Sequence, residues 1–338
     1  MMDDVEAADA SPAQAGGRLR RRVRRFAPFM GVVILAAAAW IIAGEVSAHD
    51  PAEIWRSFFA TRPTTAALTI GLCLLSFSML ALIERSVLQM LHCEQPFWRV
   101  FRFAFITYGL SNAIGFSYAS APATRARIYR DRLRVREIGA LSAISAASVA
   151  LGAVSAAGIG LLIDPPRTSI FAATPETGLR LFGVALLAPS LLWLVMSARR
   201  VDVAFLGMRF RSLGFRRGLL QVGFTTIDWF ATAAILYAFL PETMGWSYLS
   251  FVAVFVSAGL LGAVSGTPGG LGAFEATVLS LAPAGAAGPQ LIAALVAYRM
   301  IFTVFPLFIA ALLLALDFLR GTKRGVVEIA RTSGDEVL

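Results

Sequence analysis

Long uncharged stretches, separated by short charged ones, are the main pattern along this chain. They span 28–44, 63–83, 103–124, 138–163, 181–198, 243–274 and 276–298, while 218–241 and 290–316 are each interrupted by one charge. Most of these stretches reach the ~20 residues that a helix needs to cross a hydrocarbon core of ~30 Å. The pattern therefore predicts an all-α, polytopic membrane protein.

Composition supports the same class. Charged residues make up 15% of the chain and hydrophobic residues 57%, whereas soluble domains carry about 25% charged residues. The mean hydropathy is +0.72. The first apolar stretch is longer than the ~7–15 residues typical of a signal peptide, so we expect an uncleaved anchor.

The arginines predict how the chain is threaded. Of its 30 Lys and Arg residues, 25 lie in five clusters, at 18–25, 85–102, 125–136, 199–217 and 320–331. Basic residues favour the cytoplasmic side. We therefore expect a multi-pass protein of a bacterial inner membrane, with both termini in the cytoplasm.

Two stretches do not suit simple crossings. A helix over 103–124 would carry the six arginines of 125–136 outside, and Ser, Asn, Gly and Pro residues interrupt it. A hairpin that enters and leaves from the cytoplasm resolves the conflict, with its tip near Asn112 and Ala113. A second hairpin is expected from the outside, with arms at 248–264 and 273–282 joined by a turn at 265–272.

These elements form an inverted-topology repeat of about six full transmembrane helices plus two broken or re-entrant hairpins. The expected divisions are a basic, disordered N-terminal tail (1–25), two membrane repeats (26–163 and 179–319) and a cytoplasmic C-terminal tail (320–338). Paired breaks in two inverted halves point to the central site of a transporter.

The second break carries the clearest local signal. Thr267, Pro268, Gly269, Gly270 and Gly272 fall within six residues. Thr267 is expected to cap a half-helix with Pro268 at its first position, leaving free N–H groups for an anion. The alternative is that the glycines only allow close helix packing.

Three charges lie within apolar stretches and need partners, because a charge at membrane depth costs about 2.5–3.5 kcal/mol. They are Asp228, Glu275 and Arg299. Glu275 and Arg299 are expected to pair. Either the pair only locks the fold, or Arg299 faces a lipid phosphate while Glu275 or Asp228 attracts a cationic head group.

The remaining candidate chemistry is limited. Arg125 and Tyr129 begin an arginine run that is either a solvated face or a cytoplasmic entrance that gathers anionic lipids. The chain has only two histidines, His49 and His92, so we expect no metal, no cofactor and no catalytic triad. The basic residues lie between apolar stretches, so nucleic acid is not an expected partner.

The run from Thr267 to Glu275, followed by Tyr298, Arg299 and Pro306, resembles the membrane region of the bacterial lysylphosphatidylglycerol synthase/flippase family (multiple peptide resistance factor). Arg125 and Tyr129 match its first-half segment. The resemblance implies a module that moves aminoacylated phosphatidylglycerol to the outer leaflet. Full-length members add a cytoplasmic transferase domain, and we expect here a stand-alone form without it.

The predicted function is therefore transport rather than enzymatic catalysis: translocation of an anionic or aminoacylated phospholipid, such as lysylphosphatidylglycerol. A separate lipid-modifying synthase is an expected partner, and an oligomer stays open. The alternatives are a non-transporting scaffold for an envelope lipid-synthesis enzyme and a membrane enzyme acting on a lipid-linked substrate. The candidate lipid-binding residues are Thr267, Gly269, Gly270, Gly272, Glu275, Arg299, Asp228, Arg125 and Tyr129.

Overall fold

A computed structural model describes residues 62–114, 117–129, 131–166, 174–205, 208–210, 214–241, 244–283 and 289–316. Three of the predicted segments lie outside these residues: the tail over 1–25, the first apolar stretch over 28–44 and the tail over 320–338. The rest of the predicted helices can be compared with the structure directly.

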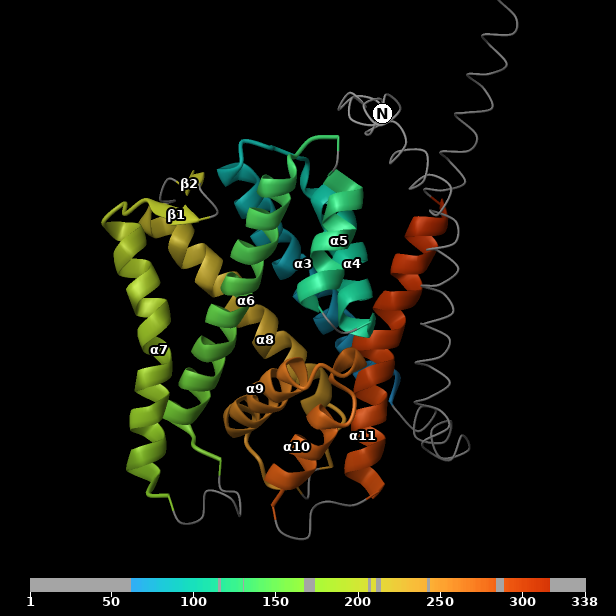
Figure 1. The fold of residues 1–338 in the computed structure, drawn as a ribbon. Helices are drawn as coiled ribbons and strands as arrows, with labels where there is room; N and C mark the ends of the chain where they lie inside the picture. The colour runs from blue at the N-terminus through green and yellow to red at the C-terminus, as the bar shows by residue number, and fades with distance from the viewer. Residues whose placement is uncertain are drawn as a thin grey trace, which may run out of the picture. The chain divides into compact units, whose positions relative to one another are not determined.

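The described chain is helical almost throughout (Figure 1). Its helices are α3 (Pro63–Met90), α4 (Phe97–Ile114), α5 (Ser117–Tyr129), α6 (Val135–Ile163), α7 (Glu176–Ala198), α8 (Phe215–Tyr237), α9 (Tyr248–Val264), α10 (Ala273–Leu281) and α11 (Pro289–Arg299). After α11 a π-helical turn, Met300–Val304, continues the same long helix. Five of the described helices are long and apolar enough to span a membrane. The predicted fold class, an all-α polytopic membrane protein, is confirmed.

One small β-hairpin follows α7. Its strands β1 (Val203–Phe205) and β2 (Met208–Phe210) pair antiparallel, with Ala204 opposite Arg209. They are the only strands among the described residues, and they lie within the arginine-rich connection between α7 and α8.

Both helical hairpins appear where the sequence breaks predicted them. In the first hairpin, α4 and α5 pack against each other and the chain turns after Ile114. In the second hairpin, α9 ends at Val264, α10 begins at Ala273, and the two pack together. The predicted arms at 248–264 and 273–282 match α9 and α10 almost residue for residue.

Small residues bring α6 close to its neighbours. A Cβ added to Gly158 would lie 2.8 Å from the backbone oxygen of Gly183 on α7, so neither position has room for a side chain. Ser155 and Ser190 share a hydrogen bond of 2.7 Å across the same contact. Since lipid supplies no hydrophobic drive between helices, such close packing and polar contacts hold these helices together.

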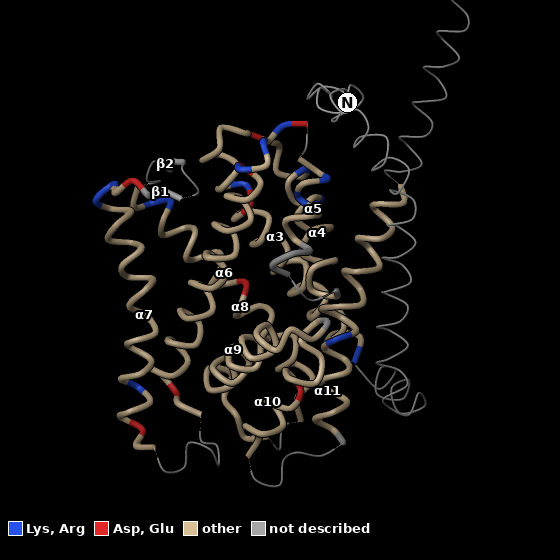
Figure 2. Tube along the Cα trace, in the orientation of Figure 1, with Lys and Arg blue, Asp and Glu red and all other residues tan. Residues whose placement is uncertain are grey.

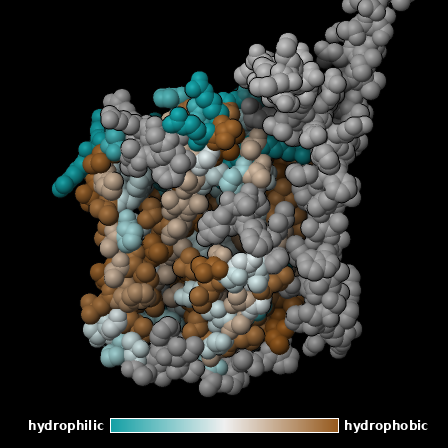
Figure 3. Space-filling view, viewed as in Figure 1, coloured by the Kyte–Doolittle hydropathy of each residue, from teal (hydrophilic) through white to brown (hydrophobic). Residues whose placement is uncertain are grey.

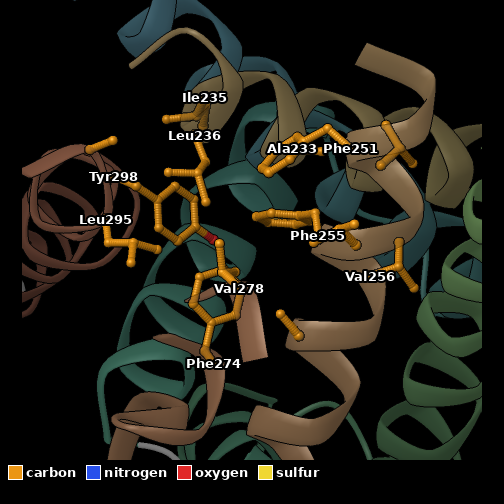
Figure 4. Close-up of a cluster of buried hydrophobic side chains, with 14 of the residues drawn as sticks. Ala233, Ile235, Leu236, Phe251, Phe255, Val256, Phe274, Val278, Leu295 and Tyr298 are labelled. Carbon is orange, nitrogen blue, oxygen red and sulfur yellow. The ribbon is translucent and has the colours of Figure 1, made fainter. Parts of the chain in front are cut away.

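Aromatic side chains fill the core around the second hairpin. Phe255, Phe274 and Tyr298 converge there from α9, α10 and α11 (Figure 4). The Phe274 and Tyr298 rings stack with centroids 5.6 Å apart, and Phe255 meets both edge-on. This cluster fixes the short helix α10 against the two long helices beside it.

Charge is distributed unevenly along the bundle. Lys and Arg residues gather mainly at the end where the α3–α4, α5–α6 and α7–α8 connections lie (Figure 2), and the same end is hydrophilic in the space-filling view (Figure 3). Hydrophobic residues cover much of the visible described surface along the helices. Most of the described arginines thus lie at one end of the bundle, as the positive-inside pattern predicts.

Candidate functional site

The tips of the two hairpins meet. A Cβ built on Gly269, in the second break, would lie 3.3 Å from the backbone oxygen of Asn112 and 3.6 Å from that of Ala113, at the end of α4. The same point lies 3.7 Å from a guanidinium nitrogen of Arg299. Two breaks that are about 150 residues apart in the sequence therefore form one contact beside a buried arginine.

A pocket of about 230 Å³ lies beside this contact, and we call it the hairpin pocket. Its walls come from α3, α4, α6, α8, α9, the second break, α10 and the last helix. The polar or backbone-exposing residues that line it include Tyr108, Ser111, Asn112, Asp228, Thr232, Gly259, Gly262, Thr267, Gly269, Gly270, Tyr298, Arg299 and Thr303. Its volume is below the ~300–1,000 Å³ of pockets for drug-sized ligands, so only a small chemical group fits inside it.

Arg299 supplies the positive charge in the pocket. Its Nε and Nη2 donate to the same oxygen of Glu275, at 2.8 and 2.6 Å, and its Nη1 donates to the backbone oxygen of Gly269 at 2.6 Å. The guanidinium carbon lies 5.2 Å from the centre of the Phe274 ring. These contacts use three of the five N–H groups of the guanidinium, which leaves two without a described protein acceptor.

The predicted pairing of Glu275 with Arg299 is therefore present, and Glu275 makes a second contact. The other oxygen of Glu275 accepts a hydrogen bond of 2.8 Å from the Gly272 N–H, at the start of α10. Glu275 thus joins the last long helix to the first turn of α10. It does not line the hairpin pocket, and both of its oxygens are engaged.

The expected cap of the half-helix was wrong. Thr267 does not cap α10, because Pro268–Gly270 form a short 3₁₀ turn and the helix begins only after Gly272. The Thr267 hydroxyl instead donates to the Leu271 oxygen at 2.9 Å. Three glycines with positive φ, at 269, 270 and 272, make this longer path possible.

Asp228 supplies the carboxyl group in the pocket. It is buried on α8, and Ser76 of α3 donates to its Oδ1 at 2.5 Å. Thr232, one turn further along α8, donates to the Asp228 backbone oxygen at 2.8 Å. Within the described part of the chain, the second carboxylate oxygen has no hydrogen-bond donor and no basic residue forms an ion pair with Asp228.

Arg125 and Tyr129 lie elsewhere. Neither lines the hairpin pocket, and both are buried against Glu84 of α3. Nη2 of Arg125 lies 2.9 Å from Oε2 of Glu84, and the Tyr129 hydroxyl donates to the other oxygen at 3.0 Å. For these two residues the solvated-face expectation was wrong, because the pairing fastens α5 to α3.

Sequence reasoning missed several of the polar residues here. Glu84 ends an uncharged stretch of the sequence, but apolar residues resume after it and α3 continues to Met90. Ser111 interrupts an apolar stretch of the sequence, and in the structure its hydroxyl is buried in the pocket wall without a described partner. Ser76 gave no signal, because single serines are common in transmembrane helices.

Known proteins resemble this chain over most of its length. Residues 29–310 match the family described as the lysylphosphatidylglycerol synthase transmembrane region. The chain belongs to this family. The resemblance carried by the second break and by Tyr298-Arg299 is thereby confirmed at the level of the family.

Relatives of two kinds are found. An uncharacterized protein of Synechocystis, slr0712, is 26% identical over 86% of this chain and 92% of its own length. The inner membrane protein YbhN of Escherichia coli is 23% identical over 87% of this chain and 91% of its own length. The phosphatidylglycerol lysyltransferase of Staphylococcus epidermidis is 39% identical over 94 residues, which are 27% of this chain but only 11% of that enzyme.

Proposed function

We propose that this protein moves a phospholipid across the bacterial inner membrane, with the head group passing through the hairpin pocket. The observation that carries the proposal is the meeting of the two hairpin tips at a pocket that holds one buried arginine and one buried carboxyl group. Irregular backbone at membrane depth is tolerated where it lines a cavity, and discontinuous helices commonly build the substrate sites of transporters.

The phosphate is assigned to the Arg299 side of the pocket. Phosphate oxygens accept hydrogen bonds, and this side of the pocket has donors for them. The donors are the two remaining guanidinium N–H groups and the Ser111 hydroxyl, which has no described partner. Gly269 and Gly270 keep this wall free of side chains. The acyl chains stay outside, in the bilayer.

The cationic part of an aminoacylated head group is assigned to Asp228. Glu275 is a poor candidate, since Arg299 and the Gly272 N–H already occupy its oxygens. Asp228 has a free oxygen and lines the pocket. A lipid that carries both a phosphate and an ammonium group, such as lysylphosphatidylglycerol, therefore suits the pocket better than a purely anionic lipid.

In the same proposal, the protein transports lipid beside a separate lipid-modifying synthase. It places both termini and the Arg-rich connections in the cytoplasm. A cysteine that replaces the exposed Arg132 should then resist an impermeant thiol reagent in intact cells, while one that replaces the exposed Glu176 should react. Labelling at 132 from outside would contradict this threading.

The experiment compares Glu275→Gln, Arg299→Gln and the double variant in proteoliposomes that contain head-group-labelled lysylphosphatidylglycerol. Each single variant leaves one charge unpaired and should melt at a lower temperature. The double variant should recover stability but move lipid about tenfold more slowly or worse, because a hydrogen bond to a charged group is worth ~1.5–3 kcal/mol. A stable double variant that moves lipid at the normal rate would remove Arg299 from the mechanism.

A further inference from the structure

Asp228 is the only carboxylate among the described residues that line the hairpin pocket. Its relative exposure is 6%, and Ser76 is the one described side chain that donates to it. A buried carboxylate without a cation is costly, whereas its protonated form is neutral and can itself donate a hydrogen bond. The pocket wall thus contains a buried carboxyl group that can hold a proton or pair with a cation.

Among the described residues, no cation forms an ion pair with Asp228. The titratable or charged groups that line the pocket with it are Tyr108, Tyr298 and Arg299. Three further groups lie behind or beside them: Cys73 on α3, Glu275 paired with Arg299, and Arg125, which pairs with Glu84 and donates to the Tyr108 hydroxyl. Arg299 is held by Glu275 and Gly269, away from an ion pair with Asp228. Helices α6 and α7 carry their charged residues only in their first two turns, and α9 carries none.

We propose that Asp228 holds a proton while the hairpin pocket is empty of lipid and releases it when a cationic head group binds. The O–H bond of the carboxyl group breaks, the proton passes to water, and the ammonium group of the lipid pairs with the resulting carboxylate. The proton leaves Asp228 as the ammonium group arrives. The total charge of the Asp228 side chain and the bound ammonium group therefore stays the same. This inference rests on the proposed function and adds a coupled ion to it.

The exchange has a consequence for energetics. If each head group that leaves the pocket is replaced by a proton, an inward proton gradient drives cationic lipid outward. The proton exchange also predicts that only lipids with an ammonium group are coupled to the gradient, because a lipid without one displaces no proton. Phosphatidylglycerol should bind through the Arg299 side alone and remain uncoupled from the gradient.

Calorimetry on the purified full chain in nanodiscs tests the proposal. Lysylphosphatidylglycerol is titrated in two buffers of different ionisation enthalpy, which gives the number of protons released. About one proton per lipid should appear, since one carboxyl group titrates, and binding should weaken as the pH falls. Phosphatidylglycerol should bind without proton release.

Two variants test whether the released proton comes from Asp228. Asp228→Asn should bind lysylphosphatidylglycerol more weakly and release no proton. Asp164→Asn, which removes a carboxylate that bonds to Ser247 at the end of α6 and does not line the pocket, should release the proton normally.

The outcomes separate this inference from the proposed function. Binding of lysylphosphatidylglycerol without proton release, or release that persists in Asp228→Asn, would overturn the proton exchange and leave lipid translocation standing. Failure of the unaltered protein to bind either lipid would overturn the proposed function itself.

Discussion

At the scale of single residues, two ion pairs fasten the two hairpins to their neighbours. Glu84 and Arg125 join α3 to α5, and Glu275 and Arg299 join α10 to the last long helix. Each hairpin thus has one charged residue on its second arm and the opposite charge on a long helix. The sequence predicted the second pair, because both members interrupt apolar stretches, but the first pair was hidden at the edges of two stretches.

Breaking the first pair should destabilise the protein strongly. Glu84 and Arg125 are 0% and 2% exposed, and removing one partner of a buried pair typically costs ~3–5 kcal/mol because the other charge is left unpaired. Glu84→Gln should therefore lower the melting temperature clearly, and adding Arg125→Gln should restore most of it. Thermal unfolding in detergent, followed by intrinsic tryptophan fluorescence, measures both.

The exposed pair Glu176–Arg180 provides the matched control. Its side chains are about half exposed, and such i,i+4 pairs contribute only ~0.3–0.5 kcal/mol. Glu176→Gln should leave the melting temperature almost unchanged. An equal drop in melting temperature for Glu84→Gln and Glu176→Gln would show that the buried pair contributes no more to stability than the exposed one.

At the scale of elements, the second break depends on glycines for two different reasons. Gly266 and Gly270 both adopt positive φ, at 69° and 70°. A Cβ on Gly266 would meet nothing within 4 Å, whereas one on Gly270 would lie 3.1 Å from the Cα of Gly262 on α9. Gly270 therefore combines a turn requirement with a close backbone approach, and this keeps the break against α9.

Alanine at each position separates the two effects. Gly266→Ala should cost only the ~1–3 kcal/mol of a non-glycine residue in the left-handed region. Gly270→Ala carries that cost plus a steric one, and should lower the melting temperature further and slow lipid movement, because the pocket wall must shift. Paired melting curves and transport rates check this; equal effects of the two substitutions would contradict the close approach at Gly262.

Element boundaries were more predictable than the geometry of the break. Charge, proline and glycine positions gave both arms of the second hairpin, because these residues act on the local backbone. The assignment of Thr267 as a cap failed because a different local contact fixes the start of α10. Glu275 takes the Gly272 N–H, and the helix starts where that contact forms. A residue three positions inside the helix therefore fixed its first turn.

At the scale of the whole membrane domain, the sequence predicted two inverted halves but not their meeting point. Nothing local to Asn112 indicates a contact with Gly269, since about 150 residues separate them. The same holds for Ser76 and Asp228, which α3 and α8 bring together. Pairings of this kind depend on helix packing, which single-residue patterns do not encode.

If lipid head groups pass through the hairpin pocket, a bulky side chain that fills this pocket should block lipid movement. Ala263 and Leu261 are both exposed on α9, but only Ala263 lines the pocket. Both Ala263→Phe and Leu261→Phe should fold and melt like the unaltered protein, because neither position is buried. Flipping of head-group-labelled lysylphosphatidylglycerol in proteoliposomes is then compared between the two.

Ala263→Phe should abolish most lipid movement, whereas Leu261→Phe should move lipid at the normal rate. Unaltered flipping by a correctly folded Ala263→Phe variant, or equal losses in both variants, would contradict passage of the head group through this pocket.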